Sequence, residues 1–156
     1  MKVTIVSVGK IKEDYFKDSI EEYCKRLKSY CNLNRIEIND EKIIESKPDY
    51  LIKNKEGEKI SKSLNEKSYK IAMTEKGKNF SSEELANFIE NIKNSGISEI
   101  SFIIGGALGL SDDILKNVDF KLSLSKMTLP HQMAYLFLTE QIYRSFKIIQ
   151  NEPYHK

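Results

Sequence analysis

The chain has 156 residues, of which 40% are hydrophobic and 31% charged, proportions typical of one soluble globular domain with its own core. No apolar run approaches the roughly 20 residues that span a bilayer, and charged residues follow the short apolar N-terminal run at once, so we expect a cytoplasmic protein without a signal peptide or membrane segment. Cys24 and Cys31 are too few for a disulfide framework and, with two histidines, match no zinc spacing, so we expect buried free thiols and no metal.

The N-terminal part of the chain alternates between strand and helix patterns. Residues 2–8 form a β-branched apolar run that predicts a buried strand. Residues 13–29 carry apolar side chains at helical spacing and predict an amphipathic helix, and residues 33–38 alternate like a second strand. The charged stretch that follows predicts a loop up to Pro48 and then a helix interrupted near Gly57.

The alternation continues with two more strands and a well-capped helix. Residues 69–74 predict a strand, and residues 75–80 the loop that leaves it. In the helix predicted over residues 81–96, Ser81 and Glu84 have the spacing of a capping box, and Gly96 is a typical C-terminal stop. Residues 99–104 predict a strand that leads directly into a glycine-rich segment.

Three further elements complete the pattern. Ser111 can cap a short helix through about residue 117, residues 120–125 predict a short strand, and the last helix is expected over residues 131–150. Strands that alternate with helices along the whole chain predict a single α/β domain, residues 1–156, in which helices cover a mainly parallel sheet.

Two segments have the character of ligand-binding loops. "IIGGALGLS" places Gly105, Gly106 and Gly109 after a strand, where α/β sheets bind ligands, but their spacing matches neither of the familiar phosphate loops. A tight turn without a ligand explains these glycines equally well. "LSLSKMTLPHQ", residues 122–132, offers backbone groups and small hydroxyls beside apolar side chains. That mixture suits a flat, uncharged ring such as adenine, although an ordinary strand-to-helix connection has the same pattern.

The C-terminal segment differs from the rest of the chain. From Lys121 onward its net charge is +3, against −1 for the other residues, which is a weak indication of an anionic partner. His131 opens the last helix, where the helix dipole favours a neutral imidazole. The helix is too broadly apolar for one narrow stripe, so we expect part of it to meet another subunit. Arg144 either pairs with Glu140 or grips a substrate oxygen, and the terminal "PYHK" is either a frayed end or part of a site.

The combination of "IIGGALGL", "LSLSKMTLPHQ", "EQIYR" and the terminal "PYHK" closely resembles the RlmH family of bacterial ribosomal RNA methyltransferases, over essentially the whole chain. That family belongs to the SPOUT class. The resemblance therefore implies a SPOUT-type α/β methyltransferase fold whose C-terminal part, within about residues 70–156, is tied into a trefoil knot. It also implies a homodimer with its pockets near the subunit interface.

The resemblance implies S-adenosyl-L-methionine as the methyl donor. As the acceptor it implies N3 of a modified pseudouridine in the 23S RNA of the large ribosomal subunit. A chain this small with little basic surface would hold free RNA weakly, so we expect it to act on assembled ribosomes. One position departs from the family, because relatives commonly have arginine where this chain has Tyr135. The residues that match the family's cofactor-binding loops are Met73, Gly105, Leu124, Ser125, Lys126, Met127, Thr128 and Leu129.

Methyl transfer to N3 requires that donor and acceptor be positioned and that the N3 proton be removed. Arg144, Tyr154 and His155 have suitable chemistry, with His131 in reserve, and we expect the tail of one subunit to close the pocket of the other. Two alternatives stay open. One is a nucleotide-dependent enzyme of another class that uses "IIGGALG" as a phosphate turn, and the other is a non-catalytic ribosome-associated factor.

Overall fold

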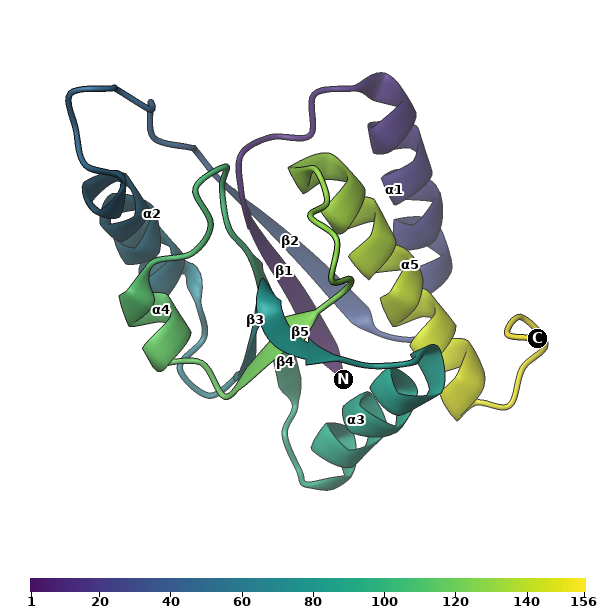
Figure 1. The fold of residues 1–156 in the computed structure, drawn as a ribbon. Helices are drawn as coiled ribbons and strands as arrows, with labels where there is room; N and C mark the ends of the chain where they lie inside the picture. The colour runs from purple at the N-terminus through teal and green to yellow at the C-terminus, as the bar shows by residue number, and fades with distance from the viewer.

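A computed structural model describes residues 1–156, with five strands and five helices that alternate along the chain (Figure 1). This alternation and a sheet in which every strand pair is parallel confirm the predicted α/β class. In chain order the elements are β1 Lys2–Val8, α1 Asp14–Leu27, β2 Asn32–Ile38, α2 Asp49–Ser63, β3 Tyr69–Asn79, α3 Ser82–Asn94, β4 Glu99–Ile104, α4 Asp112–Lys116, β5 Phe120–Ser123 and α5 His131–Ile149.

The sheet has the strand order β2-β1-β4-β3-β5 and is covered on both faces. In Figure 1, α1, α3 and α5 lie on one side of the sheet, and α2 and α4 on the other. All six residues of β4 are buried, as expected for a central strand of a parallel sheet with two covered faces. Because all strands run the same way, their carboxyl ends meet at one edge, where sheets of this kind bind ligands.

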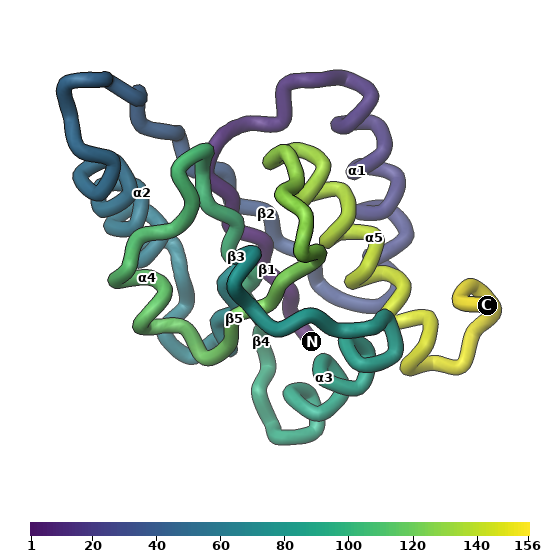
Figure 2. Tube along the Cα trace, viewed as in Figure 1, coloured from purple at the N-terminus to yellow at the C-terminus, as the bar shows by residue number.

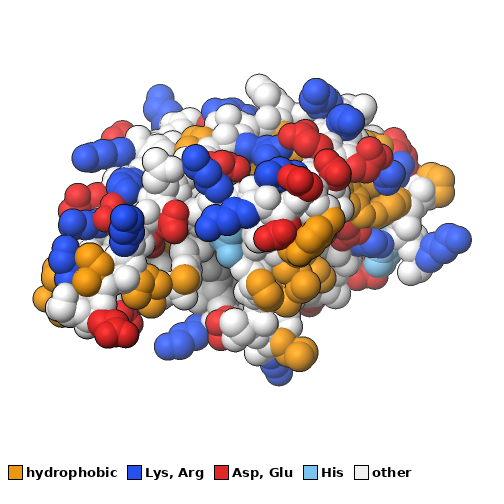
Figure 3. Space-filling view, turned by 90° about the horizontal axis from the view of Figure 1, so that it is seen from above, with side chains coloured by type: hydrophobic (Ala, Val, Ile, Leu, Met, Phe, Trp, Pro, Cys, Tyr) orange, Lys and Arg blue, Asp and Glu red, His pale blue; other side chains and the backbone are white.

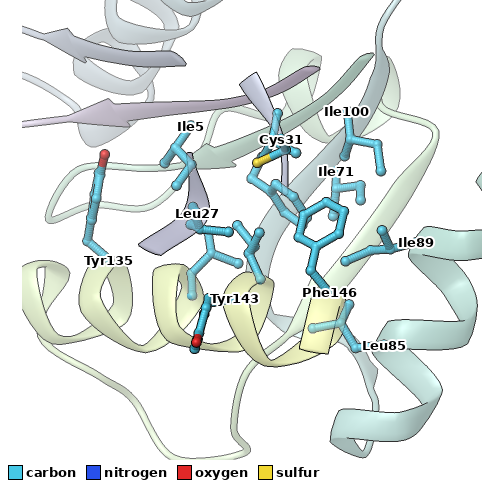
Figure 4. Packing of buried hydrophobic residues seen from close by; sticks show 14 of the residues in the cluster. Ile5, Leu27, Cys31, Ile71, Leu85, Ile89, Ile100, Tyr135, Tyr143 and Phe146 are labelled. Carbon is cyan, nitrogen blue, oxygen red and sulfur yellow. The ribbon is translucent and has the colours of Figure 1, made fainter. Parts of the chain in front are cut away.

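Side chains of successive strand residues enter two separate cores. Val3 and Ile5 of β1 belong to the larger core beneath α1, α3 and α5, whereas Val6 and Val8 belong to the smaller core beneath α2 and α4. Figure 4 shows the larger core, in which Phe146 of α5 lies among strand and helix side chains. Most of the apolar face of α5 is therefore buried against other elements of the same chain.

β3 is longer than the sequence predicts. Residues 75–80 were expected to form a loop, but β3 continues to Asn79 and pairs with β5 again after a register shift between Met73 and Lys78. Gly77 explains this continuation, because a Cβ there would lie 2.6 Å from the backbone carbon of Leu122. The missing side chain lets β3 pass close over β5, a tertiary contact that local sequence patterns do not reveal.

The predicted interruption of the second helix near Gly57 is wrong, because α2 is continuous from Asp49 to Ser63. Gly57 is buried, and a Cβ there would lie 2.5 Å from Oγ of Ser111, the N-cap residue of α4. The glycine therefore serves the close packing of α2 against the start of α4, and it does not break the helix.

Other predictions hold with small differences. Ser81 and Glu84 form the predicted capping box. β5 ends at Ser123, so the last two residues of the predicted strand belong to the loop before α5. Cys24 and Cys31 are both buried free thiols, as predicted, and burial raises the pKa of Cys31 to about 11. None of the five helices combines the length and hydropathy that a membrane-spanning segment requires.

Candidate functional site

A cavity of about 700 Å³ opens at the carboxyl edge of the sheet. Its size falls within the range of about 300–1,000 Å³ that is usual for small-molecule sites. Segments that follow β1, β4 and β5 meet there with the middle of β3 and the first residues of α5. The cavity therefore lies where the topology of a parallel sheet favours ligand binding.

Seven of the eight residues matched to cofactor-binding loops line this cavity. They come from three separate segments of the chain, which the fold brings together. Lys126 is the exception, because it lies on the loop before α5 but is exposed and outside the cavity wall. The seven are Met73, Gly105, Leu124, Ser125, Met127, Thr128 and Leu129.

The glycines after β4 form a turn that doubles back on itself. The N–H of Gly109 donates to the carbonyl of Gly106 at 2.9 Å, and Gly109 has a positive φ of 81°. A Cβ on Gly105 would lie 2.8 Å from the carbonyl carbon of Gly109. The turn itself therefore requires glycine, as one of the two sequence interpretations held, and it also lines the cavity.

The loop between β5 and α5 is held by its own hydrogen bonds. Ser123 Oγ donates to the carbonyl of Ser125 at 2.8 Å, and Ser125 Oγ accepts from the N–H of Met127 at 2.9 Å. Asn79, at the end of the extended β3, donates to the carbonyl of Ser123 at 3.1 Å. These bonds shape the loop without any ligand, so a ligand would meet a largely preformed wall.

His131 stands at the base of the cavity, beside Gly9 and Gly105. Both ring nitrogens are buried and lie close to the backbone of Gly9 and Gly105, but neither makes a hydrogen bond of good geometry. Burial lowers the pKa of the imidazole, so the ring is neutral near pH 7 as predicted. The main cause of the lowered pKa is the removal of the ring from water. A ligand reaches these nitrogens only if the backbone around them moves, because both are shielded from solvent.

The sequence analysis missed the loop between β1 and α1. Lys10 and Lys12 of this loop line the cavity, as does Gln132 in the first turn of α5. Gln132 Oε1 accepts from the backbone N–H groups of Lys12 at 2.7 Å and Glu13 at 3.1 Å, which ties the loop to α5. The available signal was the glycine at the carboxyl end of a buried strand, in "SVGK".

The three candidate catalytic residues form a cluster at the other end of α5. The guanidinium of Arg144 lies 3.3 Å from Nδ1 of His155 and 4.6 Å from the centre of the Tyr154 ring. Arg144 also pairs with Glu140, which raises the Arg144 pKa. The Tyr154 hydroxyl donates to Glu140 at 3.0 Å, and His155 Nε2 lies 2.7 Å from Oε1 of Glu83. The sequence left two roles open for Arg144, and the ion pair with Glu140 is present.

The tail that carries Tyr154 and His155 is tied down. Asn151 turns the chain with a positive φ of 53°, and the carboxylate of Glu152 then binds Lys147 and the Tyr30 hydroxyl. The hydrogen bond from Lys147, followed by that from Tyr30, lowers the Glu152 pKa. The ring of Tyr154 packs edge-on against Tyr143, 4.9 Å between ring centres. Fraying, one of the two sequence interpretations, is therefore not what the structure shows.

The cluster is remote from the cavity of its own chain. No residue of the tail lines that cavity, whereas His131 at the first position of α5 does. The 19 residues of α5 span about 28 Å, and Figure 2 shows the C-terminus beyond the far end of this helix. The fold thus brings the three candidates together but keeps them away from the cavity of their own chain.

Tyr135 occupies a core position. Only 1% of its surface is exposed, and Figure 4 shows its ring between α5 and the sheet. The guanidinium of Arg35 from β2 lies 5.9 Å from the ring centre, and the buried hydroxyl has no hydrogen-bond partner. Burial raises the Tyr135 pKa to about 12. The residue that replaces arginine here therefore does not face solvent or a large substrate.

Comparisons with known proteins agree with this arrangement. A family model described as "Predicted SPOUT methyltransferase" matches residues 1–155. Proteins named ribosomal RNA large subunit methyltransferase H from Clostridium acetobutylicum and Alkaliphilus oremlandii are 52% and 54% identical, each over the full length of both chains. A solved structure of a probable methylase family protein from Haemophilus influenzae has a TM-score of 0.54 at 14% identity. That match covers 99% of this chain and 70% of the other, and it supports the fold alone.

Proposed function

This chain belongs to the SPOUT methyltransferase family, and on that premise we propose that it transfers a methyl group from S-adenosyl-L-methionine to N3 of a pseudouridine in 23S ribosomal RNA. The observation that supports this most directly is the cavity at the carboxyl edge of the sheet, which gathers seven residues matched to cofactor-binding loops. Relatives at 52% and 54% identity carry the name of a large-subunit ribosomal RNA methyltransferase.

The walls of the cavity suit this cofactor. Met73, Leu124 and Leu129 offer apolar surface for a flat ring, while the turn at Gly105 and the loop before α5 offer backbone groups. A neutral His131 can accept or donate one hydrogen bond without repelling a cation. When bound, the cofactor supplies a methyl group on a positively charged sulfur. The chain's own task is to hold donor and acceptor in line and to exclude water.

We propose that the reacting site is shared between two subunits. Arg144 follows His131 by 13 residues, about 20 Å along α5, and Tyr154 and His155 lie beyond the end of the helix, so we infer that the three serve the cavity of another copy of the chain. Met133 and Phe137, both 43% exposed, are the apolar residues of α5 left for that contact. In this arrangement the trefoil knot would hold the cofactor-binding loops at the interface. Knot and dimer both stay predictions.

The chemistry of the three residues suggests distinct roles. Burial, followed by hydrogen bonds to Tyr23 and Glu140, raises the pKa of Tyr154, so its hydroxyl is a donor and not a base. His155 is our candidate for the group that takes the N3 proton, after it releases Arg144 at Nδ1 or Glu83 at Nε2. Arg144 would stabilise the negative charge that develops on the carbonyl oxygens beside N3, after exchanging part of its bonding to Glu140.

The decisive experiment is methyl transfer to ribosomes from cells that lack this enzyme. We expect incorporation of one labelled methyl group that nucleoside analysis locates on N3 of pseudouridine in 23S RNA. Thermal shifts with S-adenosyl-L-methionine, NAD and ATP test the cofactor in parallel. Stabilisation by NAD or ATP alone would identify another enzyme class, and cofactor binding without methylation would indicate a non-catalytic ribosome-associated factor.

The shared site is tested by deleting residues 153–156. We expect a folded dimer that binds cofactor but does not methylate. Mixing this variant with a full-length variant that cannot bind cofactor should restore activity, because one intact site forms in each mixed dimer. Full activity of the truncated dimer alone would contradict the proposal.

A further inference from the structure

We propose that Lys10, Lys12 and Lys76 form a basic rim that binds backbone phosphates of the RNA substrate at the mouth of the cavity. This inference rests on the proposed function, since it assumes that the acceptor is RNA. It adds to that function the surface by which the chain holds the RNA beside the methyl donor.

The three lysines share two properties. All three line the cavity and are exposed, and none has a carboxylate oxygen within 4.0 Å. Lys17, Lys59 and Lys147, by contrast, each have a carboxylate partner. Figure 3 looks down on this edge of the sheet, where lysine and arginine side chains, with carboxylates among them, surround a hollow. An unpaired cation can meet an RNA phosphate without first breaking a bond within the protein.

The rim is not uniformly basic. Asp40 and Glu75 also line the cavity, so the net charge of its charged lining residues is +1. Such a balance would not hold free RNA strongly, and it suits a few local phosphate contacts to a substrate positioned by other means. A carboxylate inside the cavity also suits a donor that carries positive charge. The prediction is therefore two or three phosphate contacts and not a long electrostatic track.

The backbone beneath the lysines is fixed. Gln132 accepts hydrogen bonds from the N–H groups of Lys12 and Glu13, so the first loop is attached to the helix that starts in the cavity wall. Lys76 precedes Gly77, which lies directly against the backbone of β5. The ammonium groups thus extend from backbone positions that are already fixed. Binding of RNA would therefore restrict the lysine side chains but would not have to order the two backbone segments that carry them.

The test compares two double variants that lose the same charge. Lys10→Gln with Lys12→Gln alters the rim, and Lys62→Gln with Lys67→Gln removes two exposed lysines near the amino-terminal edge of the sheet. Binding to 50S subunits and 70S ribosomes lacking the modification is measured from 0.1 to 1 M salt. The slope of the logarithm of the binding constant against the logarithm of the salt concentration reports the number of phosphate contacts. Each lost contact to a single strand reduces the size of this slope by about 0.7, so we expect a reduction of about 1.4 for the rim variant. If both proteins bind equally at 1 M salt, that corresponds to about 25-fold weaker binding at 0.1 M.

The control variant should keep the wild-type slope. Equal slopes for the two double variants would overturn the rim while leaving the proposed function intact. Calorimetry with S-adenosyl-L-methionine provides the second readout. If the rim variant loses cofactor affinity but keeps the wild-type salt slope, the lysines serve the cofactor and the proposal is wrong. Absence of ribosome binding by the wild-type protein would overturn both the rim and the proposed function.

Discussion

The two ends of α5 differ in how their polar groups are satisfied. At the N-terminal end, both nitrogens of His131 are unpaired, and Lys10 and Lys12 have no carboxylate partner. At the C-terminal end, Arg144 is bonded to Glu140 and His155, and Lys147 to Glu152. The first end is built from loops and glycines around a cavity, and the second from ion pairs and aromatic contacts.

This difference indicates how each end can act. The unpaired ammonium groups of Lys10 and Lys12 can bind a ligand without first breaking an ion pair within the protein. Paired groups must exchange partners before they touch a substrate, so the C-terminal cluster can act only if a second subunit and the RNA offer contacts that compensate.

Arg144→Ala should have the largest effect on activity. It removes the partner of Glu140 and His155 and the cation over Tyr154, and with them the proposed stabilisation of the developing anion. We expect methyl transfer to fall by about 100-fold or more, with cofactor affinity unchanged, as measured by single-turnover assay and calorimetry. Arg144→Lys keeps the positive charge but loses the planar guanidinium group, so its activity should lie between those of the wild type and the alanine variant. Wild-type activity of the alanine variant would assign the cluster a purely structural role.

Gly105→Ala should affect the cavity at the N-terminal end of α5. The added Cβ would lie 2.8 Å from the backbone of Gly109, so the turn must open. We expect the free energy of unfolding to fall by about 1–3 kcal/mol and cofactor affinity to fall by at least about tenfold. Gly96→Ala is the matched control, because its φ of +86° is strained for alanine but nothing lies within 4 Å of the new atom. The control should lose stability by about 1–2 kcal/mol and retain cofactor affinity.

His131→Gln should change the pH dependence of stability. Burial lowers the pKa of His131 below its usual 6.5, so the unfolded chain takes up a proton before the folded chain does as pH falls. Protonation of His131 therefore favours unfolding. The free energy of unfolding falls as the pH drops below 6.5, the pKa of the histidine in the unfolded chain. We expect the glutamine variant to lose less stability than wild type between pH 7 and pH 5 in urea titrations. His155→Gln controls for the second histidine, and identical pH profiles for wild type and His131→Gln would refute the prediction.

Gln132→Ala should have the smallest effect. It removes the acceptor that holds the N–H groups of Lys12 and Glu13, both at exposed positions. We expect hydrogen exchange at these two amides to accelerate about threefold, with little change in global stability. Gln150→Ala, an exposed change at the far end of α5, should leave both amides unchanged. Unaltered exchange in the Gln132 variant would show that the loop is held by other contacts.

The local patterns of the sequence were sufficient where one element decides its own structure. The capping box at Ser81 and Glu84, the apolar run of β4 and the helical spacing of α5 each depend on residues close together in the chain, and all three are present. Local patterns failed at Gly57 and Gly77, which resemble helix and strand breakers. Both instead allow a distant segment to approach closely, Ser111 in one case and Leu122 in the other.

The residues of the candidate site also differ in how far the sequence could predict them. Motif resemblance found seven residues that line the cavity. Six of them follow strands whose carboxyl ends must meet, and the seventh, Met73, lies within β3. The resemblance missed Lys10 and Lys12 and the role of Gln132, since these depend on contact between the first loop and a helix about 120 residues later. Arg144, Tyr154 and His155, the three candidate catalytic residues, lie together in the structure, and α5 separates them from the cavity of their own chain.

Strand and helix periodicity was enough to predict the α/β class and the order of the elements, because periodicity is a local property. The residues alone left the ligand-binding loops open, and the family resemblance matched seven residues of the cavity wall. Which polar groups are paired and which are free could be read only from the fold, because pairing depends on distances between segments far apart in the chain. That distinction separates the open cavity at His131 from the anchored tail at His155.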